Sequence, residues 1–346
     1  MNHVDTAFSS HIPEWAEGAP SLIARCAQLA MLLEVSASPK PGNVDREHNY
    51  PDTCFEHFVA SSVAVYPVLE LAARSRDGIG LLLRRAVYES SVWQKGGNTH
   101  FGAFLLLIPL AMAAGEISRE TPSPGKAGFR LEVEEFEFLA ARAHAFVRAT
   151  SCEDAVEFYR AFGHAGVRVN SVGEFDLEDP EATADLREQN ITLYDLMEIS
   201  RGYDLIANEW TSGFGLCLEG AESILEFMQA RNCEAEALTG GSVSTCSGTG
   251  INEAVVYTFL KMLSRHRDTF IQTKFDPATA DYVSARAGEL LSGWEASGKT
   301  SRDFAFILPA VQEFDSELLE KRINPGSTAD IIIAGLFIAL LGGLRF

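Results

Sequence analysis

Apolar residues recur every three to four positions through most of this chain, which is the spacing of a buried stripe on an α-helix. The stretch from Ser21 to Val35 shows the pattern clearly, with Ser21 as a suitable N-cap and with Pro39 and Pro41 ending the helix. The same spacing predicts helices over residues 54–74, 79–93, 99–114, 131–150, 152–162, 193–210, 220–230, 250–266, 278–297, 301–321 and 328–341. The periodicity thus predicts about a dozen helices.

The alternation of apolar and polar residues that is typical of a β-strand is compatible with one segment, VRVNSVGEFDL within residues 166–177, which suits a hairpin or an ordered loop. The sequence contains no internal repeat. Two candidate linkers, 121–127 and 234–249, are short and lie between apolar helices. We therefore expect an all-α fold with one compact domain over residues 1–346, beginning with a polar leader at 1–19.

Composition and charge exclude several classes of protein. Hydrophobic residues make up 47% of the chain, and 28 basic against 48 acidic residues give a formal charge of −20, which disfavours binding to nucleic acid or to an anionic membrane. The longest apolar run, residues 331–344, is shorter than the roughly 20 residues of a membrane span, so a buried helix is expected there. The start of the chain resembles no export signal, which makes a cytoplasmic location the expectation. The six cysteines form no CxxC pair.

The first segment with chemical potential is SASPKPGNVD, which follows the first predicted helix. Its prolines stiffen the loop, and Gly42 permits a backbone conformation that other residues avoid. A lysine held in such a loop, Lys40, suits a phosphate, while Asp45 and the preceding Glu34 suit the magnesium ion of a nucleoside triphosphate. The alternative is an ordinary helix-breaking turn with a solvated lysine.

The second segment, GGNTHFG at residues 96–102, leads into an apolar helix. Gly97 frees the backbone, and Asn98 or Thr99 can cap the helix, whose first amides would form an anion site. His100 lies in the first turn, where it can donate to a phosphate or protonate a leaving base. The alternative is a histidine that simply packs beneath the cap.

Acidic residues on later helices are further candidates. Asp154 shares a helical face with Glu157 and Arg160, which is also what a solvated, salt-bridged face would show. Asp204 and Glu209 flank an apolar stretch and are either metal ligands or paired acids. Asp330, in NPGSTADIII, falls in the first turn of the last predicted helix, where simple capping accounts for the motif.

Taken in this order, these segments resemble the triphosphoribosyl-dephospho-CoA synthase family, which makes the prosthetic-group precursor of citrate lyase and malonate decarboxylase. The resemblance spans most of the chain and includes EVSASPKPGNVD, GGNTHFG, DAVEFYRAF, YDLIANEW, DTFIQTK and NPGSTAD. It implies an all-α transferase that moves the 5-triphosphoribosyl group of ATP to the ribose 2-hydroxyl of 3-dephospho-CoA and releases adenine. Magnesium is the implied partner of the triphosphate.

The resemblance also implies roles for individual positions. The family's acidic element after the first loop matches Asp52 but lacks its histidine here, and Asn43 stands where the family has leucine. The expected nucleotide-binding residues are Lys40, Gly42, Asn43, Gly97, Asn98, Thr99 and Gly102. The expected catalytic residues are Asp52, Asp154 and His100, and the expected magnesium ligands are Glu34, Asp45, Asp204 and Glu209.

Two alternative functions stay open. A paralogous enzyme of the same fold would keep the ATP site and use another acceptor, and the departures at Asn43 and beside Asp52 favour this reading. A non-catalytic nucleotide-binding scaffold would keep the packed helices, but the retained acids argue against it. The apolar helix near the C-terminus and the 22 phenylalanines leave room for a homodimer interface.

Overall fold

The computed structural model describes residues 18–120, 129–165, 182–239, 250–296 and 301–346, and within these ranges it contains helices and no strand. The all-α prediction is confirmed. The β-compatible stretch at 166–177 and the first candidate linker, 121–127, lie outside the described residues. Of the second candidate linker, only residues 234–239 are described, and they continue the helix that precedes them. The helices are α1 (Ala19–Ser36), α2 (Phe55–Ala64), α3 (Tyr66–Arg74), α4 (Ile79–Trp93), α5 (Phe101–Glu120), η1 (Val133–Glu135), α6 (Phe136–Arg148), α7 (Cys152–Ala165), α8 (Ala182–Glu188), α9 (Leu193–Ser200), α10 (Leu205–Ser212), α11 (Gly215–Thr239), α12 (Ile251–Arg265), α13 (Thr269–Lys274), α14 (Pro277–Ala296), η2 (Ser301–Phe306), α15 (Leu308–Glu320) and α16 (Gly326–Leu341).

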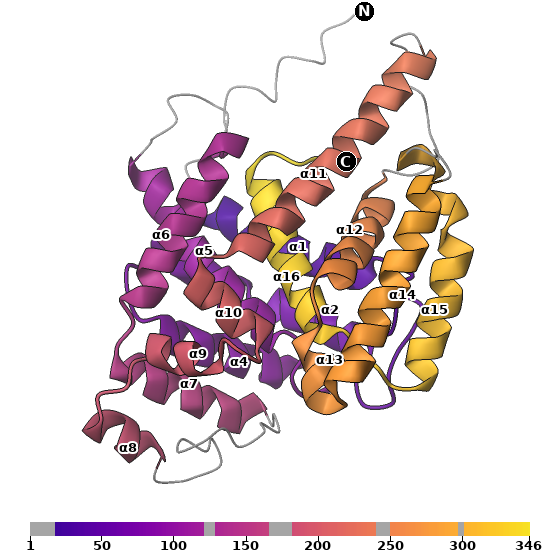
Figure 1. Ribbon diagram of the computed structural model, residues 1–346. Coiled ribbons are helices and arrows are strands. Elements are labelled where there is room, and N and C mark those ends of the chain that lie inside the picture. The colour runs from indigo at the N-terminus through magenta and orange to yellow at the C-terminus, as the bar shows by residue number, and fades with distance from the viewer. Residues whose placement is uncertain (1–17, 121–128, 166–181, 240–249, 297–300) are drawn as a thin grey trace, which may run out of the picture.

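The C-terminal helix α16 forms the centre of the molecule. It packs against α1, α5, α11 and α12, and in Figure 1 it runs in yellow between these helices. Nearly every side chain from Ser327 to Leu341 is buried, as a helix that is apolar on all sides requires. The sequence prediction of a buried C-terminal helix is therefore confirmed.

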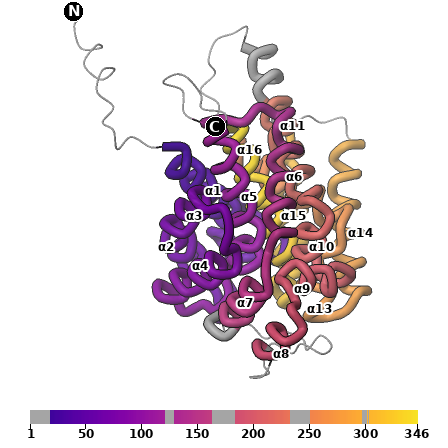
Figure 2. The backbone as a smooth tube through the Cα atoms, turned by 90° about the vertical axis from the view of Figure 1, so that its left-hand side faces the viewer, coloured from indigo at the N-terminus to yellow at the C-terminus, as the bar shows by residue number. Residues whose placement is uncertain are grey.

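Helix α5 is the second core element. By length and composition it would pass as a membrane span, but 83% of the relevant window is buried against other helices of this protein. In Figure 2, helices α2 to α4 lie on the left of this core, and α13 and α14 lie on the right. The start of α5 and the start of α16 thus come together in the interior.

Three predicted helices are interrupted. The helix expected over 301–321 consists of the 3-10 helix η2, which ends at Phe306, and of α15, which begins at Leu308. The other two divide into separate α-helices. The helix expected over 54–74 ends at Ala64, and α3 restarts at Tyr66, because Pro67 lacks the N–H that a continuous helix would need. The helix expected over 193–210 divides between Ser200 and Leu205, where Asp204 caps α10. In both cases the helical spacing of the apolar residues continues across the break, so the spacing did not reveal it.

Short elements and caps account for the other differences. Helices α8 and α13 have 7 and 6 residues, too few for a clear helical period, and were not predicted. Helix α1 begins at Ala19 after Gly18, so Ser21 is not its N-cap. The Ser21 hydroxyl instead donates a hydrogen bond of 2.6 Å to Glu70 on α3.

Candidate functional site

A cavity of about 430 Å³ opens where four segments meet, and these segments are far apart in the sequence. The loop after α1, the start of α5, helix α13 and the turn before α16 form its walls. The lining residues include Glu34, Asn43, Tyr50, Asp52, Asn98, Thr99, His100, Gly102, Phe270, Lys274, Arg322, Asn324 and Asp330. The two motifs that sequence analysis singled out therefore do face one space.

The N-terminus of α5 forms one wall of the cavity. Asn98 caps the helix, because its Oδ1 accepts the Phe101 N–H at 2.9 Å, which confirms the predicted capping. The carboxylate of Asp330 accepts the Ala103 N–H. A Cβ added to Gly102 would lie 2.1 Å from Oδ2 of Asp330, so glycine is needed here for the close approach of the carboxylate. The helix amides thus bind a carboxylate of the protein itself.

Two carboxylates, Glu34 and Asp330, lie deep in the cavity wall. Burial and the charge of Glu34 raise the pKa of Asp330 well above its usual range. Burial is also the main cause that raises the pKa of Glu34, and Lys40 opposes it. Both acids line the cavity, so a molecule bound there can exchange a proton with them.

Lys40 has a different partner from the one that sequence predicted. Its side chain is fully buried, and its ammonium forms an ion pair with the buried Glu34. It does not line the cavity. This corrects the expectation that Lys40 contacts a phosphate: the loop does hold the lysine in place, but behind Glu34, where it neutralises a buried carboxylate.

His100 lies in the cavity wall with a polar network behind it. Burial lowers the pKa of its imidazole to about 3, so the ring is neutral at physiological pH. Its Nδ1 lies 2.9 Å from the Ser61 hydroxyl, which accepts a hydrogen bond of 2.8 Å from Ser90. Its Nε2 is buried and has no hydrogen-bond partner among the described residues. One ring nitrogen is thus held by the protein and the other is available to a ligand.

Three further predicted residues line the same cavity. Asn43 lies in the cavity wall, and its Nδ2 donates a hydrogen bond to the Pro325 carbonyl at 3.4 Å. The buried Thr99 hydroxyl has no partner among the described residues. Asp52 is exposed at the mouth. Together with Glu34, Asn98, His100 and Gly102, these are the expected residues that the structure brings together.

The loop glycines have structural roles outside the cavity lining. Gly42 has φ +72°, as the sequence predicted, and its N–H donates to Asp315 on α15 at 2.8 Å. A Cβ there would lie 2.1 Å from the Ile323 carbonyl. Gly97 has φ +70°, and its carbonyl accepts a hydrogen bond from Gln94. Both glycines shape the loops that carry the lining residues.

The remaining predicted acids hold the loop after α1 and the helices α10 and α11 in place. Asp45 is buried beneath the loop and accepts the N–H groups of Glu47 and His48 at 2.8 and 2.9 Å. Asp204 caps α10, and Glu209 accepts the Cys217 N–H at 2.9 Å. Of the four expected magnesium ligands, only Glu34 lines the cavity. The four therefore do not form one ligand set.

Asp154 is placed elsewhere. Its carboxylate accepts the N–H groups of Gly80 and Ser151 at 2.9 and 2.8 Å, which ties α7 to the start of α4. It lines a separate pocket near Arg76 and Phe146, not the cavity described above. Its spacing on α7 reflects this packing, so we do not count it among the catalytic candidates.

Sequence reasoning missed two cations and one acid. Lys274 and Arg322 are exposed at the cavity mouth, and Asp330, which also lines the cavity, was predicted only to lie in the first turn of a capped helix. Asp268 shows how these distant segments meet: it caps α13 and accepts the Thr328 N–H and hydroxyl on α16 at 2.7 and 2.8 Å. The sequence did offer a signal, because Lys274 is the last residue of the motif DTFIQTK and Asp330 is the last residue of NPGSTAD.

The chain is similar to known proteins over most of its length. The family sequence model for ATP:dephospho-CoA triphosphoribosyl transferase matches residues 20–345. A Vibrio cholerae protein assigned as 2-(5''-triphosphoribosyl)-3'-dephosphocoenzyme-A synthase is 22% identical over 330 residues, covering 91% of this chain and 86% of that protein. The Klebsiella pneumoniae synthase of the same name is 24% identical, with 92% and 90% covered. A crystal structure from Archaeoglobus fulgidus, assigned as a triphosphoribosyl-dephospho-CoA synthase, has a TM-score of 0.58 and 27% identity, with 84% and 100% covered.

Proposed function

This chain belongs to the ATP:dephospho-CoA triphosphoribosyl transferase family, and we propose that the cavity between α1, α5, α13 and α16 is where it performs that transfer. In the reaction, the bond between the ribose anomeric carbon of ATP and adenine breaks. A bond forms from that carbon to the ribose 2-hydroxyl oxygen of dephospho-CoA. The observation that carries the proposal is the meeting of the buried Glu34, the partly buried Asp330, a neutral histidine and two cations in one cavity.

The carboxylates suit the charge that develops on the sugar. Breaking the glycosidic bond leaves positive charge on the ribose, and a carboxylate beside it lowers the barrier. The attacking hydroxyl must also lose a proton, and a carboxyl group with a raised pKa is the better acceptor. We assign these tasks to Glu34 and Asp330, whose pKa values are both raised by burial. We assign Asp52, which is exposed at the mouth, to contact with the acceptor.

His100 suits the leaving base. Ser61 accepts a hydrogen bond from Ser90, so its own proton is free to be donated to Nδ1 of His100. The imidazole proton then lies on Nε2, the nitrogen without a protein partner. A neutral N–H directed at a ring nitrogen of adenine stabilises the negative charge that the base acquires as it leaves.

Magnesium is proposed to accompany the triphosphate. The oxygen ligands that this ion prefers are present in the cavity as Glu34, Asp330 and the Oδ1 atom of Asn324, which is buried and accepts no hydrogen bond from the described residues. When bound, the ion would offset phosphate charge on a protein whose formal charge is −20. Lys274 and Arg322 supply the protein's own positive charge at the mouth.

Removing either cation at the mouth should weaken ATP binding. We expect Lys274→Ala and Arg322→Ala each to raise the KM for ATP roughly tenfold with a smaller change in kcat, because a charge-assisted hydrogen bond to phosphate is lost. The measurement is steady-state adenine release. Lys321→Ala is the matched control, since Lys321 neighbours Arg322 but pairs with Glu317 at 2.6 Å and does not line the cavity. An equal rise in KM in the control would argue against a local phosphate contact.

The close approach of Asp330 to Gly102 gives a second prediction. In Gly102→Ala the new methyl group must displace the carboxylate that lies 2.1 Å from the Cβ position, so we expect adenine release to fall and the free energy of unfolding to drop by about 1–3 kcal/mol. Urea unfolding and the adenine assay measure the two effects. Gly293→Ala on α14 is the control, because a Cβ there meets nothing within 4 Å. A Gly102→Ala enzyme that matches wild type in both assays would mean that Asp330 has no fixed position.

The proposed activity is tested directly by incubating pure protein with ATP, magnesium and dephospho-CoA and separating the products by chromatography. Free adenine without ADP is the expected result. ADP in its place would show phosphoryl transfer and overturn the proposal.

A second candidate function is the same transfer to another acceptor. It is favoured by Asn43, a polar side chain in the cavity wall where the family has leucine. Adenine release that requires a different hydroxyl compound and is absent with dephospho-CoA would support this candidate over the first.

A further inference from the structure

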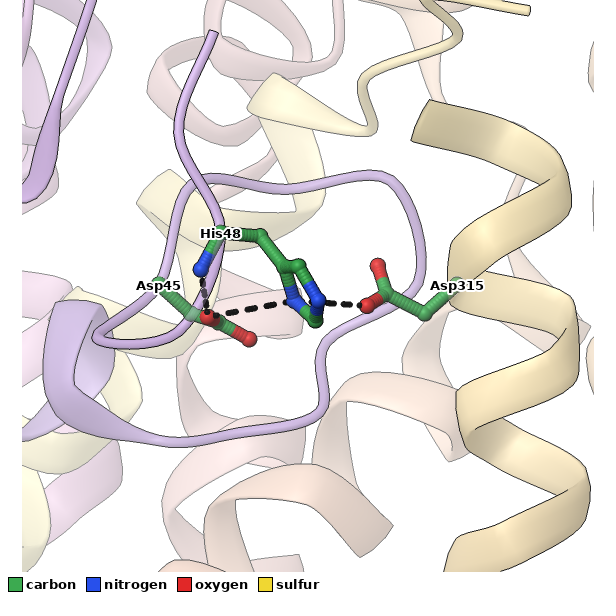
Figure 3. Close-up of side chains that lie close together, drawn as sticks. All are labelled: Asp45, His48 and Asp315. Carbon is green, nitrogen blue, oxygen red and sulfur yellow. Dashed lines mark hydrogen bonds and ion pairs between the residues drawn. The ribbon is translucent and has the colours of Figure 1, made fainter. Parts of the chain in front are cut away.

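A second cluster of ligating side chains lies outside the cavity, where the loop after α1 meets α15. Asp45 and His48 come from the loop and Asp315 comes from α15, with the imidazole between the two carboxylates (Figure 3). None of the three lines the cavity. We propose that Asp45, His48 and Asp315 bind a first-row divalent transition metal ion, Zn²⁺ in the first instance, that fastens this loop to α15.

The geometry fits such an ion. Nδ1 of His48 lies 3.0 Å from Oδ2 of Asp315 and 3.6 Å from Oδ1 of Asp45, and the three ligand atoms all lie within 4.8 Å of one another. Ligand atoms on a tetrahedral Zn²⁺, with bonds of roughly 2.0–2.2 Å, are separated by roughly 3.3–3.6 Å. One nitrogen and two oxygen ligands favour Zn²⁺ or Mn²⁺ over Mg²⁺, which prefers oxygen alone.

The surroundings hold the ligands in place and leave one oxygen for a cation. The Gly42 N–H fixes Oδ1 of Asp315, and the N–H groups of Glu47 and His48 fix Oδ1 of Asp45. Oδ2 of Asp315 is buried and accepts no hydrogen bond from the described residues, although it points toward His48. His48 is 30% exposed, which gives an ion access from solvent.

Charge gives a further reason. Asp45 and Asp315 are both fully buried, and within the described residues neither has a lysine or arginine at ion-pair distance. Two buried carboxylates beside one histidine are costly unless a cation compensates them. The loop that contains Asp45 and His48 also contains Asn43 and Tyr50, which line the cavity. The ion would therefore stiffen one side of the proposed active site.

The test measures metal binding to the full chain without substrates, so its outcome does not depend on the transferase proposal. Protein stripped with EDTA is titrated with ZnCl₂ by calorimetry in excess Mg²⁺, and with CoCl₂ while the d–d absorption bands are followed. We expect about one ion per chain, and at least about tenfold weaker binding in His48→Ala and Asp315→Asn. His266→Ala is the matched control, because His266 is also 30% exposed and contacts a carboxylate, that of Glu219, at 3.0 Å.

Wild-type affinity in His266→Ala together with weak binding in His48→Ala supports the site. Binding that is the same in wild type and His48→Ala, or no binding at all in wild type, overturns the proposal and leaves the cluster as direct contacts between His48 and the two carboxylates. Circular dichroism of each variant shows whether it is folded. His48 is partly exposed, so its truncation tests the site with the smaller risk to folding.

Discussion

Lys40→Met is expected to destabilise the fold far more than it changes ATP binding. The substitution leaves Glu34, which is 2% exposed, as a buried carboxylate without its ion-pair partner. Removing one member of a buried pair costs about 3–5 kcal/mol, so the urea midpoint should fall sharply at neutral pH. A direct phosphate contact would instead raise the KM for ATP in a protein of unchanged stability, and that result would contradict the buried arrangement.

The pH dependence of this loss has a definite sign. Burial already raises the pKa of Glu34 in the folded protein, and losing Lys40 removes the group that lowers it. An acid whose folded pKa lies above its unfolded value costs stability at high pH, and the cost disappears as the pH falls below both values. The destabilisation of Lys40→Met should therefore shrink as the pH is lowered from 8 toward 5.

A double variant separates the pair from its individual members. Lys40→Met combined with Glu34→Gln removes both charges, so its stability should lie nearer to wild type than that of either single variant. Its transferase activity should nevertheless stay low, because Glu34 lines the cavity. If the two single effects simply add, the ion pair is not the source of the loss.

This pair shows where sequence reasoning reached its limit. The stiff loop, the positive φ of Gly42 and the position of Lys40 follow from local chemistry and were predictable. The partner of the Lys40 ammonium was not predictable, because a phosphate and a buried carboxylate are both anions that pair with a lysine. Only the burial of Glu34 on α1 distinguishes them.

The same distinction applies to the rest of the site. Asn98, Thr99, His100 and Gly102 were predictable because a glycine-rich helix start has its own pattern, and all four line the cavity. Lys274, Arg322 and Asp330 come together because α13 packs against α16 and the turn before α16. The motifs DTFIQTK and NPGSTAD mark these segments, but the local sequence does not show that the segments meet. The helices were predictable where the period of the hydrophobic residues specifies them. The helix breaks at Pro67 and at the Asp204 cap were not predicted.

Replacing His100 by glutamine should abolish most of the proposed transferase activity while leaving the protein folded. In the proposed mechanism the imidazole donates from its unpartnered Nε2 to the leaving adenine, and a positioned donor or acid of this kind contributes about 10²- to 10⁴-fold to the rate. The loss should appear in kcat for adenine release. Ser61→Ala, which removes the group that orients Nδ1, should lower kcat by a smaller factor without changing the KM for ATP greatly.

The pH profile tests the neutral form of the ring. With a pKa of about 3, His100 keeps the same charge from pH 5 to 9, so its titration should produce no inflection there. An inflection near pH 6.5 that vanishes in His100→Gln would show that the protonated ring is the active form and contradict the assignment. His144→Gln is the control, because the pKa of His144 is also lowered by burial and its Nε2 also has no described partner, yet it does not line the cavity. We expect that variant to keep the wild-type kcat, since an unpartnered imidazole affects the reaction only where it meets the substrate.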